Sequence, residues 1–130
     1  MFATLFVLLY VAHLLADYPF QTDHQAGHKA GCGAAGWRAN LSHAGTHLVL
    51  SGLALLVGWA VLDLHVGLVP AAVALLWVAG SHAFVDRRWL VARWMAFARQ
   101  AGWAQHGGAA HVDQTAHITA IFLAALALAA

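Results

Sequence analysis

The stretch LSHAGTHLVLSGLALLVGWAVL, residues 41–62, decides the fold class because it is almost wholly apolar yet begins with two histidines. It is long enough to cross a bilayer as a helix, which takes roughly 20 residues. His43 and His47 are four residues apart, so they fall on the same face of such a helix. Two metal-ligating side chains at one end of an apolar helix are the pattern that the rest of the chain repeats.

Composition indicates a membrane protein. Of the 130 residues 62% are hydrophobic and 8% are charged, whereas a water-soluble domain has about 25% charged residues. The net charge of +1 excludes a nucleic-acid-binding protein, which needs a strong basic excess. The single cysteine, Cys32, excludes an intramolecular disulfide and a cysteine-based zinc site. Any bound metal would therefore take nitrogen and oxygen ligands.

Four apolar segments predict an all-α fold, a four-helix transmembrane bundle that forms a single integral membrane domain over residues 1–130. The predicted spans are 1–17, 41–62, 66–86 and 112–130. The first span has no Lys or Arg before its apolar run, and His13 and Asp17 occupy the place of a cleavage site. These features favour a retained helix over a signal peptide.

Basic residues lie in only two of the three connections between these spans. They are Lys29 and Arg38 in the first connection and Arg87, Arg88, Arg93 and Arg99 in the third. By the positive-inside rule both connections face the cytoplasm and both termini face outward. The third connection also predicts an amphipathic helix over about 87–101 that lies on the membrane surface, with Leu90, Val91, Trp94, Phe97 and Ala98 on its apolar face.

Each predicted span carries one pair of potential metal ligands four residues apart. The pairs are His13 with Asp17, His43 with His47, His82 with Asp86, and Asp113 with His117. They fall at the C-terminal ends of the first and third spans and at the N-terminal ends of the others, so all four lie at one depth, the cytoplasmic one. A charged side chain facing lipid costs about 2.5–3.5 kcal/mol at mid-membrane, so the pairs are expected to face one another.

The order of these pairs repeats along the chain. The first ligands of consecutive pairs lie 30 residues apart in one half of the chain (positions 13 and 43) and 31 residues apart in the other (positions 82 and 113). A basic connection lies between them in each half. Such spacing predicts two pseudo-symmetric helical hairpins related by an axis along the membrane normal.

Five histidines and three aspartates predict a site for divalent metal, with two ions expected, zinc favoured, and manganese, iron and nickel left open. The alternative is that these side chains only hold the helices together through hydrogen bonds. Residues predicted to support the ligands or to bind substrate are Gln21, Lys29, Arg87, Arg88 and Gln114. The other histidines, His24, His28, His65, His106 and His111, are expected at the surface.

The stretch His13-Leu-Leu-Ala-Asp17-Tyr-Pro-Phe-Gln21-Thr-Asp, with Lys29 following, resembles the opening signature of a family of small bacterial and phage multi-pass membrane proteins known only as a domain of unknown function. Ser42-His43, His82-Ala-Phe-Val-Asp86 and Asp113-Gln114-x-x-His117 match its other motifs in order. The layout is also distantly similar to membrane-bound metal-dependent hydrolases. The first resemblance implies a bacterial inner membrane protein, and the second implies metal-dependent hydrolysis.

Together these features predict a membrane-embedded metal-dependent hydrolase that acts on a lipid or a small molecule from the cytoplasmic interface. G-x-S-x-G, P-loop and H-E-x-x-H motifs are absent, so any hydrolysis must depend on the metal. The alternatives are a metal-ion or proton transporter, oxidative di-metal chemistry on lipid chains, and a phage or host accessory protein with a structural metal. A homodimer is left open.

Overall fold

The computed structural model describes all 130 residues, and every regular element in it is a helix. The all-α prediction is therefore confirmed. The elements in chain order are α1 (Phe2–Asp17), α2 (Asp23–His28), α3 (Gly33–Leu62), α4 (Leu68–Val85), α5 (Trp89–Phe97), α6 (Ala101–Trp103), the π-helical turn η1 (Ala104–Gly108) and α7 (Ala109–Ala129).

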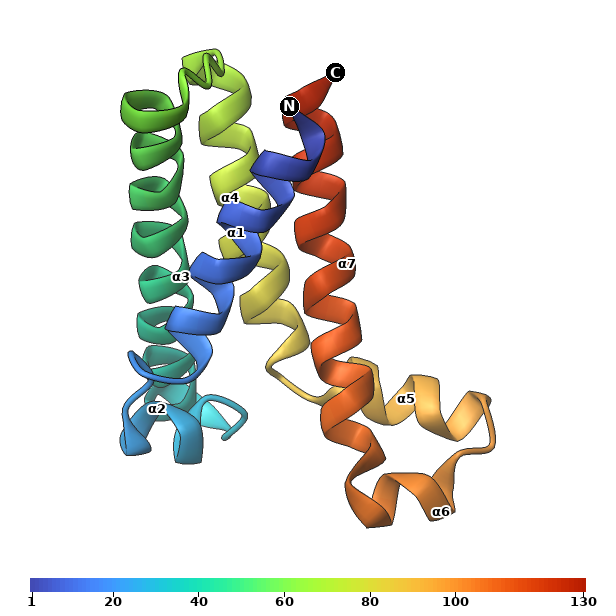
Figure 1. Ribbon diagram of the computed structural model, residues 1–130. Coiled ribbons are helices and arrows are strands. Elements are labelled where there is room, and N and C mark those ends of the chain that lie inside the picture. Colours follow the sequence, from blue (N-terminus) through green and yellow to red (C-terminus); the bar gives the residue numbers. More distant parts are fainter.

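The four longest helices contact one another in a closed order. Helix α1 packs against α3 and α7, and α4 packs against the same two helices. Figure 1 shows both chain termini and the turn between α3 and α4 at one end of the molecule, with α2, α5 and α6 at the other end. The two connections that contain all the Lys and Arg residues therefore lie at the end opposite the termini.

Three helical segments are long and apolar enough to cross a membrane: α3, α4 and the continuous run Ala101–Ala129 that includes α7. Helix α1 is apolar but shorter, and its 16 residues reach about 24 Å at 1.5 Å per residue. Large apolar side chains point outward from these helices, among them Leu53, Val73, Leu76 and Leu123. Such an outer surface indicates a membrane protein, because a water-soluble domain seldom exposes so large an apolar area.

The helix boundaries differ from the predicted spans at two places. Helix α3 begins at Gly33, not at residue 41, and its first turns pack against α2. Helix α7 begins at Ala109 and follows a kink at Gly107, whose φ of +91° favours glycine. Hydropathy marks only the long apolar part of a helix, so it missed the beginning of α3, which includes Arg38 and Asn40.

Residues 23–28, in the connection between the first two predicted spans, form a short helix that the sequence did not predict. Thr22 caps α2, because its side chain accepts a hydrogen bond from the Gln25 backbone while the Gln25 side chain accepts one from the Thr22 backbone. This capping box satisfies two backbone donors that the helix would otherwise leave free. Helix α2 thereby fixes the course of the connection that carries Lys29.

Helix α5 is shorter than the predicted surface helix and uses a different face for packing. It runs outward across the lower end of α7 in Figure 1 and contacts α4 and α7. Val91 and Met95 are buried, whereas Trp94 and Phe97 are exposed. The sequence placed Val91, Trp94 and Phe97 on one lipid-facing side, and that part of the prediction is wrong because α7 covers Val91.

The interior of the molecule is divided along its length. At the end with the termini the core is apolar, built from residues such as Leu5, Leu9, Val78 and Ile121. Toward the other end the buried polar side chains are mostly histidine and aspartate. The four long helices thus position one polar cluster at the end where α1 and α4 stop.

Candidate metal centre

Seven of the eight predicted ligands meet in one buried cluster. They are His13, Asp17, His43, His47, His82, Asp86 and His117, and none is more than 6% exposed. The eighth, Asp113, lies at the edge of the cluster and is 24% exposed. All four long helices contribute, so the cluster exists only when the whole fold has formed.

Helix ends explain why the two buried carboxylates lie here. Pro19 cannot continue the helix, and α1 ends at Asp17 with Tyr18 as its C-cap. Asp86 is itself the C-cap of α4. The histidines one turn earlier, His13 and His82, lie on the same faces as these carboxylates because of the four-residue spacing. Helices α3 and α7 run past these ends and supply the facing ligands.

Asp17 is the centre of the cluster. Its Oδ1 atom lies 3.1 Å from Nε2 of His43 and 3.1 Å from Nε2 of His47, both on α3. The same atom lies 3.4 Å from Nε2 of His82 on α4. The imidazoles also approach one another, with His82 Nε2 3.2 Å and His47 Nε2 3.4 Å from His43 Nε2.

Most distances among these four ligand atoms match a tetrahedral site. Ligands about 2.0–2.1 Å from a tetrahedral zinc ion lie about 3.3 Å from one another. Five of the six distances among Asp17 Oδ1 and the Nε2 atoms of His43, His47 and His82 range from 3.1 to 3.4 Å, and the sixth joins His47 and His82, whose rings stack. The residues that could hold a first ion are therefore three imidazoles and one carboxylate, all buried.

The imidazoles cannot all donate to Asp17. If His43 and His82 each carry a proton on Nε2 to donate to Asp17, the two protons meet across the 3.2 Å gap between the nitrogens. A hydrogen bond from His82 to Asp86 Oδ2, 3.2 Å away, would relieve this conflict. A shared cation would relieve it too, because all four atoms could then direct lone pairs at the ion.

A second group of ligands adjoins the first. Asp86, Asp113 and His117 have ligand atoms that lie within 4.8 Å of one another. His117 Nε2 is 3.6 Å from Asp86 Oδ1 and 3.4 Å from Asp113 Oδ2. Asp86 Oδ2 also lies 3.2 Å from His82 Nε2, so the two groups are adjacent. This second group has three ligands, one of which is partly exposed.

His13 is in the cluster but is held differently from the other four imidazoles. Its Nε2 atom lies 3.0 Å from Oε1 of Gln114, and the Gln114 amide nitrogen donates to Asp17 Oδ2 at 2.9 Å. The amide oxygen therefore faces His13 and accepts a hydrogen bond from its Nε2 proton. Binding an ion through His13 requires that this proton leave, although His13 still lies close enough to Asp17, His47 and His82 to share a site.

The chain matches the family model described as "Protein of unknown function (DUF3307)" over residues 5–130. It belongs to the DUF3307 family. The predicted membership of an uncharacterised domain family is thereby confirmed, and the match includes all eight predicted ligands. Among the curated proteins and the solved structures there is no match.

The residues predicted to support the ligands of this DUF3307 chain have separate roles. Gln114 contacts the cluster directly, whereas Gln21 donates to the backbone carbonyl of Asp17 at 2.7 Å. Lys29 Nζ lies 3.0 Å from Asp86 Oδ2. Arg87 points elsewhere, because it donates to the carbonyls of Lys29 and Gly31 and so holds the connection that presents Lys29.

Several polar residues near the ligands tie helices together instead of touching the cluster. Asn40 is fully buried and donates to the Ala83 carbonyl, which joins α3 to α4. Gln25 on α2 donates to Ser42 on α3. Gln25 gave no signal in the sequence other than its capping position. Thr46, Ser81 and Thr115 bond only to their own helices.

The remaining histidines lie outside the cluster, as the sequence predicts. His24 and His28 stack on each other on the exposed side of α2. His65, His106 and His111 are exposed as well and contact backbone carbonyls near them in the chain. All five are available as control positions for the cluster.

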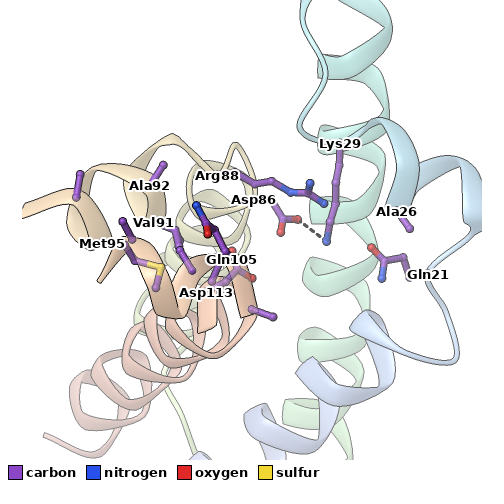
Figure 2. Close-up of a pocket in the computed structure, with 15 residues that line it drawn as sticks. Gln21, Ala26, Lys29, Asp86, Arg88, Val91, Ala92, Met95, Gln105 and Asp113 are labelled. Carbon is purple, nitrogen blue, oxygen red and sulfur yellow. Dashed lines mark ion pairs between the residues drawn. The ribbon is translucent and has the colours of Figure 1, made fainter. Parts of the chain in front are cut away.

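A pocket of about 720 Å³ opens beside the second ligand group. Figure 2 shows Asp86 and Asp113 at its wall, with Lys29 reaching Asp86 from the other side. Arg88 also lines the pocket, and α5 supplies an apolar side that includes Val91 and Met95. The less buried end of the ligand cluster is thus the end that a small molecule can reach.

Replacing Gln114 by leucine should lower the free energy of unfolding by about 1–3 kcal/mol, because buried polar groups of His13 and Asp17 lose their partner. Thermal unfolding in detergent, followed by circular dichroism, measures the change. Gln105→Leu is the matched control, because Gln105 is exposed. Equal unfolding temperatures for the two variants would contradict the role assigned to Gln114.

Proposed function

We propose that this chain is a membrane-embedded metal-dependent hydrolase that acts on a lipid or another substrate at the membrane interface. The observation that carries the proposal is the pairing of a closed group of four ligands with an adjacent group of three that faces a pocket. Structural metal sites are closed by protein ligands, whereas catalytic sites keep a position free for water or substrate. The two groups have these two forms.

Zinc is the favoured metal, with manganese, iron and nickel as alternatives. Three imidazoles and one carboxylate at tetrahedral spacing form a nitrogen-rich set that suits zinc. A divalent ion in the open group would polarise a substrate oxygen and supply a nucleophilic water at neutral pH. Asp113 is the most exposed carboxylate of the cluster, so it can serve either as a ligand or as the general base.

We further propose that the four long helices form a transmembrane bundle with the site at its cytoplasmic end and both termini outside. The basic residues at the site's end and the termini at the other support this orientation through the positive-inside rule. The amphipathic α5 would then lie at the cytoplasmic surface of a bacterial inner membrane. In each half of the chain, the aspartate that follows the first ligand faces ligands of the next long helix: Asp17 faces His43, and Asp86 faces Asp113 and His117. This parallel supports two pseudo-symmetric hairpins.

A metal-ion carrier is less well supported because a transported ion needs a polar route across the membrane. Beyond the cluster, toward the termini, the interior consists of apolar residues such as Leu5, Leu9 and Ile121. Ser51, one turn after His47, is the only buried polar side chain in that direction. The distribution of polar groups favours a reaction at one surface.

Purified protein should contain about two equivalents of a divalent metal, as expected for a two-metal site. His47→Ala removes a ligand of the closed group and His117→Ala one of the open group, so each should lose about one equivalent. Inductively coupled plasma mass spectrometry on detergent-purified protein gives the count. His24→Ala, at an exposed position, should retain both ions. A metal-free, folded wild type would refute the proposal.

A hydrolase releases a product from its substrate, whereas a carrier moves metal into a sealed vesicle. We expect metal-loaded protein to release water-soluble product from a lipid panel in nanodiscs, and His117→Ala to reduce the release to background because the open group loses a ligand. Mass spectrometry of the products and metal uptake into proteoliposomes are measured in parallel. Uptake without product would favour the carrier. If neither uptake nor product is observed, only a structural role remains for the metal.

A further inference from the structure

We propose that the pocket binds an anionic lipid, with a phosphate headgroup between Lys29 and Arg88 and a hydrocarbon chain along α5. Lipid binding by the pocket does not depend on the proposed function. Only the statement that the bound lipid is the substrate rests on it. The proposal narrows the substrate class to lipids that combine a negative headgroup with at least one long apolar chain.

The positive side of the pocket is formed by two side chains from different connections. Lys29 follows α2, and Arg88 precedes α5. Lys29 compensates Asp86 at 3.0 Å, and His117 lies 3.4 Å from Asp113. Arg88 is exposed, lines the pocket and forms no ion pair. Arg88 is therefore the one charged side chain of the pocket lining without an oppositely charged or imidazole partner, and an arginine suits a phosphate because its guanidinium binds two oxygens at once.

The backbone at Arg88 supports a positioning role for this side chain. Its φ is +64°, in the left-handed region that residues with a side chain seldom adopt. Such conformations persist where the surrounding structure holds them and are found preferentially at binding sites. Here the turn between Asp86 and α5 directs Arg88 toward Lys29 and the pocket, as Figure 2 shows.

The rest of the pocket offers a small hydrophilic ester only Gln21 and Gln105 as polar side chains. Nine of its fifteen lining residues are hydrophobic, and apart from Ala26 on α2 they come from α5, from the residues that lead into α7 and from the first turn of α7. A second groove of about 620 Å³ lies on the other side of α5, and Val91 lines both. The second groove is lined by apolar and aromatic residues, including Leu90, Trp94 and Trp103.

The pocket offers a place to each part of one lipid. The headgroup end is beside Asp86 and Asp113, the apolar side of the same pocket follows α5, and buried Val91 lies between this pocket and the aromatic groove. Trp94 and Phe97 on α5 are exposed, as expected for side chains at the level of lipid headgroups. A lipid in this place brings its phosphate to the open group of ligands.

Tryptophan fluorescence tests the proposal, since Trp77, Trp94 and Trp103 all line the second groove. The full chain is placed in phosphatidylcholine nanodiscs that contain a trace of either phosphatidic acid or phosphatidylcholine with brominated chains. Bromine quenches tryptophan only at close range. The wild type should be quenched more strongly by the brominated phosphatidic acid, with an apparent affinity about fivefold or more above that for phosphatidylcholine.

Arg88→Gln should lower this preference by about fivefold, which is the contribution expected of one cation near a membrane surface. Lys29→Gln is the second variant and should also lower it. Arg93→Gln is the matched control, because Arg93 is on the same connection but faces the Trp89 ring and does not line the pocket. An equal loss in Arg93→Gln, or no preference in the wild type, would overturn the proposal.

Competition by free glycerol phosphate shows whether the pocket binds a lipid or a soluble phosphate ester. It should compete poorly with brominated phosphatidic acid, and full competition at similar concentration would show that the chain contributes nothing and overturn the lipid assignment. The metal content of the same samples is measured as well. Metal-loaded protein without lipid preference would refute this inference alone, whereas a lipid preference in metal-free protein would refute the hydrolase and leave the lipid site in place.

Discussion

The approach of three imidazoles to one oxygen of Asp17 is the interaction on which the other features depend. The three come from α3 and α4, while the carboxylate ends α1. An ionised carboxylate and several imidazoles are costly to bury in an apolar interior unless they are paired or bind a metal. Four helices must therefore end or pass at one level. Helix length, register and the course of both polar connections follow from that requirement.

The two polar connections border the ligand cluster that the long helices position. Lys29 reaches Asp86 because α2 is capped at Thr22 and Arg87 holds the carbonyls of Lys29 and Gly31. On the other side α5 crosses α7 and leaves a pocket next to Asp113. One face of the cluster is thus closed by helices, and the other is bordered by side chains of both charges and by an apolar wall. This asymmetry is the feature on which the proposed hydrolase function rests.

Four-residue spacing and helix ends were sufficient to predict from the sequence that the four ligand pairs lie at one end of the molecule. Side-chain partners were harder to predict, because the bond of His13 to Gln114 depends on how α1 and α7 face each other. Hydropathy could not show that α3 begins at Gly33, since its first turns lie before the long apolar run that marks the span. The sequence also could not show which face of α5 packs against α7. Val91 and Trp94 are both apolar, and only the position of α7 makes one buried and the other exposed.

The central claim is that ions bind within this cluster, and anomalous X-ray scattering from crystals of the purified protein tests it most directly. Data on both sides of the zinc absorption edge should give one peak enclosed by Asp17, His43, His47 and His82, at about 2.0–2.1 Å from each ligand atom. A second peak should lie among Asp86, Asp113 and His117. An ordered cluster in which no anomalous peak lies near these side chains, at this edge or at those of manganese, iron and nickel, would contradict the account.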